Sequence, residues 1–79
     1  MKIKWESNSI IQTEIEKCSK EDDSFELIAN KEGLISLSNI LLEMAKDEYA
    51  DGYHLHLDEW SGLEKGSIEI TLMRKEHTK

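Results

Sequence analysis

Strict alternation of apolar and polar residues in the second half of the chain is the strongest constraint on its fold. Over residues 53–58 and 67–73 every second side chain is apolar, the pattern of a strand with one buried face and one open face. The glycine-containing segment between them supplies a turn. We therefore predict an antiparallel β-hairpin over residues 53–73. Its apolar face is formed by Tyr53, Leu55, Leu57, Ile68, Ile70 and Leu72, and its open face by His54, His56, Asp58, Ser67, Glu69 and Thr71.

A helix is predicted over residues 30–48. Asn30 is a strong N-cap residue because its side-chain oxygen accepts a hydrogen bond from a free backbone N–H of the first turn. Glu32 places negative charge near the positive end of the helix dipole. Apolar residues then recur three and four positions apart, which predicts one apolar stripe. The stripe comprises Leu34, Leu37, Leu41, Met44 and Ala45, widened by Ile40, Ile35 and Leu42.

The first 29 residues alternate in shorter pieces. Residues 2–6, 11–16 and 25–29 each have strand spacing, and Ser7–Ser9 has turn composition. The chain is thus predicted to be one small α+β domain, because an apolar helix stripe and the apolar face of a sheet can bury each other. We expect two layers: an antiparallel sheet of about four strands, with the helix packed on one face. The expected organisation is N-terminal strands 1–29, helix 30–48, hairpin 53–73 and a frayed charged tail 74–79, within a single domain 1–79.

Seventeen acidic residues against ten basic residues give the chain a net charge of −7, which disfavours nucleic acid as a partner. No apolar run approaches the ~20 residues of a membrane span, and no secretory signal follows Met1. The single Cys18 permits no intrachain disulfide, which favours a cytoplasmic location. A deep active site is difficult to build in 79 residues, so we expect binding rather than catalysis and no cofactor.

A metal site is the alternative that the hairpin leaves open. Alternate strand residues point the same way about 6 to 7 Å apart, so His54, His56 and Asp58 share one face, with Glu69 on the next strand. Imidazole and carboxylate ligands suit zinc or iron. An ordinary solvated sheet face explains the same residues and is the more common case. Cys18 has no histidine near it in sequence and is expected to be an incidental thiol.

An acidic and aromatic segment is the second candidate site. Between Glu43 and Glu64 there are seven acidic residues and one basic residue, which account for −6 of the net −7. Aromatic residues within an acidic field suit an interface for a basic protein partner. Trp60 either caps the core or stands exposed as a binding hot spot, whereas Leu63 is expected to fill the core. The predicted partner-binding residues are Tyr53, His54, His56, Asp58, Glu59, Trp60, Glu64 and Glu69.

Three short stretches carry a family resemblance. They read AN-x-EGL from Ala29, H-x-HLDE from His54, and GLE-x-GS-x-E from Gly62. Their order and spacing resemble the immunity protein 32 family of bacterial polymorphic toxin systems, over about residues 25–74. The positions that match the pattern are Asn30, Glu32, Gly33, His54, His56, Asp58, Glu59, Gly66, Ser67 and Glu69.

The resemblance implies a non-enzymatic cytoplasmic protein that binds a cognate toxin and blocks it. An acidic inhibitor suits a basic, nuclease-type toxin domain, because opposite charges accelerate association. Two other readings stay open: the metal-binding domain described above, and a homodimer that buries the polar sheet face or a strand edge.

Overall fold

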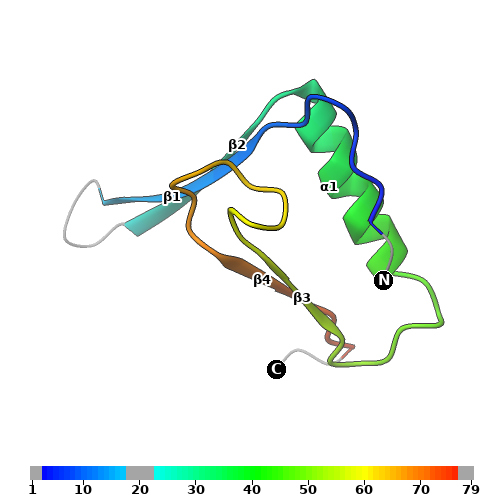
Figure 1. Cartoon of the computed structure of the whole chain (residues 1–79). Coiled ribbons are helices and arrows are strands. Elements are labelled where there is room, and N and C mark those ends of the chain that lie inside the picture. Colours follow the sequence, from blue (N-terminus) through cyan, green and yellow to red (C-terminus); the bar gives the residue numbers. More distant parts are fainter. Residues whose placement is uncertain (1–2, 18–22, 77–79) are drawn as a thin grey trace.

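The structure is a computed structural model that describes residues 3–17 and 23–76; Cys18 and most of the connector after it lie outside the described residues. The elements follow in the order β1 (Ile11–Lys17), β2 (Asp23–Ala29), α1 (Lys31–Met44), β3 (His54–Leu57) and β4 (Ile70–Met73) (Figure 1). β1 pairs antiparallel with β2, and β3 pairs antiparallel with β4. The predicted α+β class is confirmed.

The strands form two separate two-stranded sheets, so the prediction of one continuous sheet is wrong. The segment before β4 does reach β1: the Glu64 N–H donates to the Ile11 carbonyl at 2.7 Å, and the Ile68 N–H donates to the Thr13 carbonyl at 3.2 Å. Between these two hydrogen bonds the chain advances four residues, from Glu64 to Ile68, whereas β1 advances only two, from Ile11 to Thr13. A regular ladder of paired residues therefore cannot form. A short bulged contact therefore joins the two hairpins in place of a shared sheet.

The start of α1 is tied to the turn before β1. The side-chain oxygen of Asn30 accepts hydrogen bonds from the N–H groups of Gly33 at 2.8 Å and Ile10 at 2.9 Å, and its amide donates to the Asn8 carbonyl at 2.9 Å. A Cβ on Gly33 would lie 2.2 Å from the Ile10 carbonyl oxygen, so only glycine allows this approach. The predicted N-cap is confirmed, and the helix ends at Met44, earlier than residue 48.

The buried face of α1 differs from the predicted stripe. Gly33, Ser36, Ile40 and Met44 are buried, and Leu37 packs partly buried against them. Small residues determine which side of α1 faces the core, because Gly33 lies against Ile10 and the Ser36 hydroxyl accepts the Glu6 N–H at 2.8 Å. The prediction is therefore wrong for part of the stripe, whose exposed members are Leu34, Ile35, Leu41, Leu42 and Ala45.

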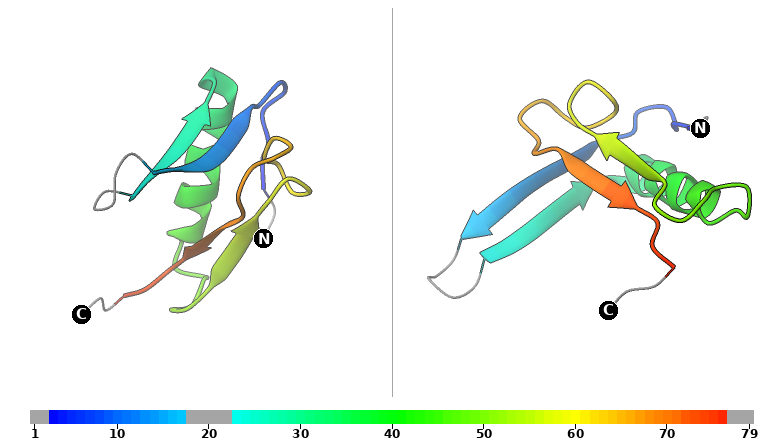
Figure 2. Two further views of the ribbon diagram at one scale, coloured as in Figure 1. Left: turned by 90° about the vertical axis from the view of Figure 1, so that its left-hand side faces the viewer. Right: turned by 90° about the horizontal axis from the view of Figure 1, so that it is seen from below.

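The core lies where α1 meets the start of β1 and the β3–β4 hairpin with its loop. Its buried apolar residues are Ile11, Ile40, Met44, Leu57 and Leu63. Figure 2 shows the helix and this hairpin as the two layers, with the β1–β2 hairpin extending away from them. Burial of such side chains is worth about 1.5–3 kcal/mol each before the entropic cost of folding, so this small cluster is the main apolar stabilisation.

Residues 3–6 form no strand, contrary to the prediction for residues 2–6. Ile3 packs against the core instead, and the Trp5 ring lies directly against Gly62. A Cβ on Gly62 would lie 2.2 Å from the Trp5 ring, and its φ of 121° is rarely adopted by other residues. The N-terminal segment therefore braces the β3–β4 loop.

Arg74 is an ordered structural residue, which corrects the prediction of a frayed tail from residue 74. Its Nη1 donates to the carbonyls of Met44 at 3.2 Å, Lys46 at 2.6 Å and Tyr49 at 3.0 Å. Its Nε donates to the Glu76 carboxylate at 2.7 Å. A cation is favourable here because the carbonyls at a helix C-terminus carry partial negative charge. Residues 77–79 lie outside the described residues.

Candidate partner-binding surface

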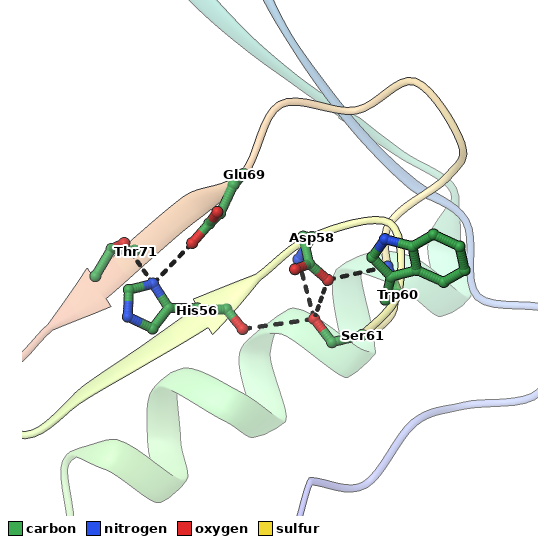
Figure 3. A network of polar contacts seen from close by, with 6 residues as sticks. All are labelled: His56, Asp58, Trp60, Ser61, Glu69 and Thr71. Atoms are coloured by element: carbon green, nitrogen blue, oxygen red, sulfur yellow. Dashed lines mark hydrogen bonds and ion pairs between the residues drawn. The ribbon is translucent and has the colours of Figure 1, made fainter.

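The loop after β3 is held by hydrogen bonds centred on Asp58 (Figure 3). The Asp58 carboxylate accepts the Trp60 N–H and the Ser61 hydroxyl, both at 2.9 Å. Its backbone carbonyl accepts the N–H groups of Ser61 and Leu63, both at 3.0 Å. Aspartate side chains commonly form such turns by accepting a backbone N–H two residues on. The loop therefore has a defined conformation set by its own polar groups.

Two large apolar residues of this loop have opposite environments. Leu63 is only 4% exposed and belongs to the core, as the sequence predicted. Trp60 is 88% exposed and projects from the tip of the turn (Figure 3). The structure thus resolves the choice that the sequence left open, because Trp60 does not cap the core. An exposed tryptophan on a constrained turn needs little ordering when it enters a partner's pocket.

The open face of the β3–β4 hairpin carries a polar cluster. His56 Nδ1 lies 2.8 Å from the Glu69 carboxylate and 3.0 Å from the Thr71 hydroxyl. The His54 ring meets the His56 ring edge to face, with centroids 5.2 Å apart. These side chains are exposed, so the cluster contributes little to stability. The predicted open-face positions of His54, His56 and Glu69 agree with this arrangement.

The proposed metal ligands do not converge. Asp58 directs its carboxylate to its own loop, whereas His56 directs Nδ1 to the opposite strand (Figure 3). Within residues 3–17 and 23–76, no group of three or more His, Cys, Asp or Glu side chains is placed to hold a metal ion. The alternative of a metal site at His54, His56 and Asp58 therefore has no geometric support.

The remaining predicted surface residues have different positions. The Glu59 carboxylate accepts the Gly66 N–H at 3.1 Å, across a turn that needs a φ of 91° at Gly66. Glu64 is half-buried at the junction with β1. Tyr53 packs partly buried against the core, so it lies apart from the open face. The surface that the structure assembles is consequently His54, His56, Asp58, Glu59, Trp60 and Glu69.

A second polar network, which sequence reasoning missed, lies after α1. Tyr49 donates its hydroxyl to the Glu43 carboxylate at 2.9 Å, and Lys46 pairs with the same carboxylate at 2.9 Å. The hydrogen bond to Glu43 raises the pKa of Tyr49 to about 12. The hydrogen bonds from Lys46 and Tyr49 hold the pKa of Glu43 below its ordinary value, and Glu43 raises the pKa of Lys46. The i, i+3 spacing of Glu43 and Lys46 pointed to the ion pair.

The fold and this surface define a small α+β domain that presents an acidic, aromatic face. The sequence profile of the family described as Immunity protein 32 matches residues 24–75, from β2 to just beyond β4, and the chain belongs to this family. The resemblance noted from the sequence is thereby confirmed. Neither the curated proteins nor the solved structures gave a match. In the described part of the chain, no helix has both the length and the apolar character needed to cross a membrane.

The family pattern mixes two kinds of residue. Asn30 and Gly33 hold the start of α1 against Ile10, and the Ser67 hydroxyl accepts the Thr13 N–H at 3.1 Å. These positions serve the fold. His54 and Glu69 lie exposed on the open face and have no comparable structural task. The pattern therefore identifies the architecture more directly than it identifies a binding site.

Proposed function

We propose that the chain is an immunity protein that neutralises a cognate bacterial toxin by binding it, without catalysis. Membership of the immunity protein 32 family supports this role. The proposed place of action is the cytoplasm, where a toxin reaches its target. The proposed binding surface consists of His54, His56, Asp58, Glu59, Trp60 and Glu69, with Glu64 and Tyr53 at its border.

The exposure of Trp60 is the observation that carries the proposal. A side chain that is 88% exposed contributes almost nothing to the core, yet the Asp58 turn holds its backbone in place. Tryptophan is enriched among the few interface residues that supply most binding free energy. A hydrogen-bonded turn also lowers the entropy lost when the ring becomes immobilised.

The charge around Trp60 favours a basic partner. Asp58, Glu59 and Glu64 lie in the segment that contains Trp60, and the whole chain has a net charge of −7. A basic domain, such as the nuclease-type toxin that we propose as the partner, would be attracted before contact and would associate faster at low salt. Neutralisation would then follow if the bound protein covers the toxin's phosphate-binding surface.

The test compares wild type with Trp60→Ala in capture from the native bacterium and in co-expression with the captured protein. We expect wild type to retain one basic protein and to restore growth when that protein is expressed. Trp60→Ala should weaken the complex at least tenfold, on the order of 2 kcal/mol for a hot-spot residue. The dissociation constant, measured by calorimetry, is the readout.

Phe25→Ala is the matched control, because Phe25 is an exposed aromatic residue on the β1–β2 hairpin. It should bind as wild type does. A captured protein that is not toxic would contradict the immunity function. Equal affinity of Trp60→Ala and wild type for a toxic partner would instead contradict the surface.

A further inference from the structure

An apolar groove lies between α1 and β4, away from the Trp60 loop. Its volume is about 470 Å³. The helix side is apolar, and the strand side is formed by consecutive residues of β4 and those that follow it. The lining residues are Leu41, Met44, Ala45, Thr71, Leu72, Met73, Arg74 and Glu76. Figure 2 (right) shows β4 running towards the C-terminal end of α1.

Among the strands of residues 3–17 and 23–76, none pairs with the edge of β4 that does not face β3. The Arg74 N–H donates to the Tyr53 carbonyl at 2.8 Å, which sets the alternation of the β3–β4 ladder. In an antiparallel ladder the backbone groups of alternate residues point to opposite sides. Those of Thr71 and Met73 therefore point away from β3. Within the described ranges, no group hydrogen-bonds to the backbone of either residue on that side.

Exposed apolar side chains flank the same groove. Met73 is 54% exposed and Leu41 is 49% exposed, and both residues line the groove. An unpaired strand edge beside an apolar wall offers both hydrogen bonds and a place for alternate side chains of an added strand. Such an edge is usually protected by charge, proline or a covering element.

The negative charge of the chain favours a basic segment of another protein over a second copy of the chain as the occupant of this groove. A second copy would bring together two chains of net charge −7, which repel each other. The loop beyond α1 adds the exposed acids Asp47, Glu48 and Asp51 near Arg74, whose guanidinium is already bonded to carbonyls. An extended segment that combines apolar and basic residues complements both features.

We propose that the α1–β4 groove binds an extended, basic and apolar segment of a protein partner as an added strand on β4. The segment would accept a hydrogen bond from the Thr71 or Met73 N–H and place apolar side chains against Leu41 and Ala45. This site adjoins the proposed toxin-binding surface, because the Thr71 hydroxyl contacts His56 and Met73 pairs with His54, but the outward backbone edge of β4 is no part of that surface. It does not depend on which residues of that surface bind a toxin.

The test is a titration of the isotope-labelled full chain with a short acetylated and amidated peptide of alternating lysine and valine, followed by NMR. We expect saturable shifts at the amides of Thr71, Met73, Leu41 and Ala45. The same peptide N-methylated on every second amide cannot form strand hydrogen bonds on that edge, and it should bind about tenfold more weakly.

Met73→Pro removes the outward N–H from the chain itself. Proline is tolerated at such an edge position, because this N–H makes no ladder bond to β3. The variant should melt close to wild type and lose peptide binding about tenfold, whereas Met73→Ala, which keeps the N–H, should lose less. The chemical shifts of β3 will verify that its ladder is intact.

Three results would overturn the proposal. The first is no shift at these amides with peptide at up to about 1 mM, which excludes even weak binding. The second is equal binding of the N-methylated peptide, which would indicate charge attraction alone. The third is a concentration-dependent doubling of mass that Met73→Pro abolishes, which would assign the edge to a second copy of the chain.

Discussion

The two ends of the β3–β4 hairpin are built on different principles. At the loop end, hydrogen bonds within residues 58–66 define the conformation, and Leu63 anchors it in the core. At the open end, the Arg74 side chain bridges the hairpin to carbonyls at and beyond the end of α1, and the Glu76 N–H donates to the Asp51 carboxylate. The loop end displays the exposed ring of Trp60, whereas the open end leaves a groove beside the outer edge of β4.

This difference has a consequence for how mutations act. A loop held by several local bonds should tolerate the loss of one of them, because the others still define its shape. A junction in which one guanidinium makes three carbonyl contacts should tolerate its loss less well, because these contacts disappear together.

Arg74→Ala is expected to be the most destabilising change, by about 2–3 kcal/mol. It removes the guanidinium that donates to the carbonyls of Met44, Lys46 and Tyr49, and with it the cation at the helix C-terminus. Urea unfolding followed by circular dichroism gives the free energy. Lys75→Ala, which removes an exposed charge at the next position, is the control and should change it by less than about 0.5 kcal/mol. Similar effects of the two variants would refute the bridging role.

Gly62→Ala tests the brace at the loop end. The added Cβ would overlap the Trp5 ring and would have to adopt a φ of 121°, so we expect a loss of about 1–3 kcal/mol. Gly52→Ala is the matched control, because Gly52 also has a positive φ of 89° but has open space around it. It should cost less than Gly62→Ala in the same unfolding measurement. Equal losses would attribute the whole effect to backbone strain.

The elements of the fold were largely predictable, because they depend on local patterns. Alternation over residues 53–58 and 67–73 located β3 and β4, and Asn30 located the start of α1. The face of α1 that is buried was not predictable, because it depends on the close approach of Gly33 to Ile10. These two residues lie far apart in the sequence. A prediction from hydrophobicity assigns the leucines to the buried face. It ignores small residues such as Gly33 and Ser36, which determine the buried face here.

The candidate site was predictable in composition but not in geometry. Acidic and aromatic residues indicated the region, and alternation placed His54, His56 and Glu69 on one face. Whether Trp60 lay inside or outside depended on which of two apolar loop residues the core accepted, and Leu63 took that place. The role of Arg74 was not predicted, because its partners are backbone carbonyls, and every residue type has a backbone carbonyl.

Asp58→Asn and Asp58→Ala separate the charge of the Trp60 loop from its conformation. Asparagine keeps an oxygen that can accept the Trp60 N–H, so its stability should stay within about 0.5 kcal/mol of wild type, whereas alanine should lose about 1 kcal/mol. With the partner in hand, Asp58→Asn combined with Glu59→Gln should slow association and flatten its salt dependence. Glu14→Gln combined with Asp47→Asn removes the same charge elsewhere. If both pairs slow association equally, the effect is one of net charge.

The Tyr49–Glu43 contact next to the open end should have the smallest effect on stability near neutral pH, and a titration detects it most directly. Because the chain has two tyrosines, Tyr53→Phe leaves Tyr49 as the one that titrates. Its ultraviolet absorbance should report a pKa of about 12, and adding Glu43→Gln should lower that pKa towards 10.0, since the negative partner is gone.

The sign of the pH dependence follows from the direction of each shift. A raised Tyr49 pKa means that the contact stabilises the fold below pH 10 and is lost as the pH rises from 10 through about 12. The lowered pKa of Glu43 means that its contribution is present above pH 4.5 and is lost as the pH falls through the folded-state value. Glu43→Gln should therefore flatten the pH dependence of the melting temperature at both extremes. A Tyr49 that titrates near its ordinary value would show that the hydroxyl does not donate to Glu43 in solution.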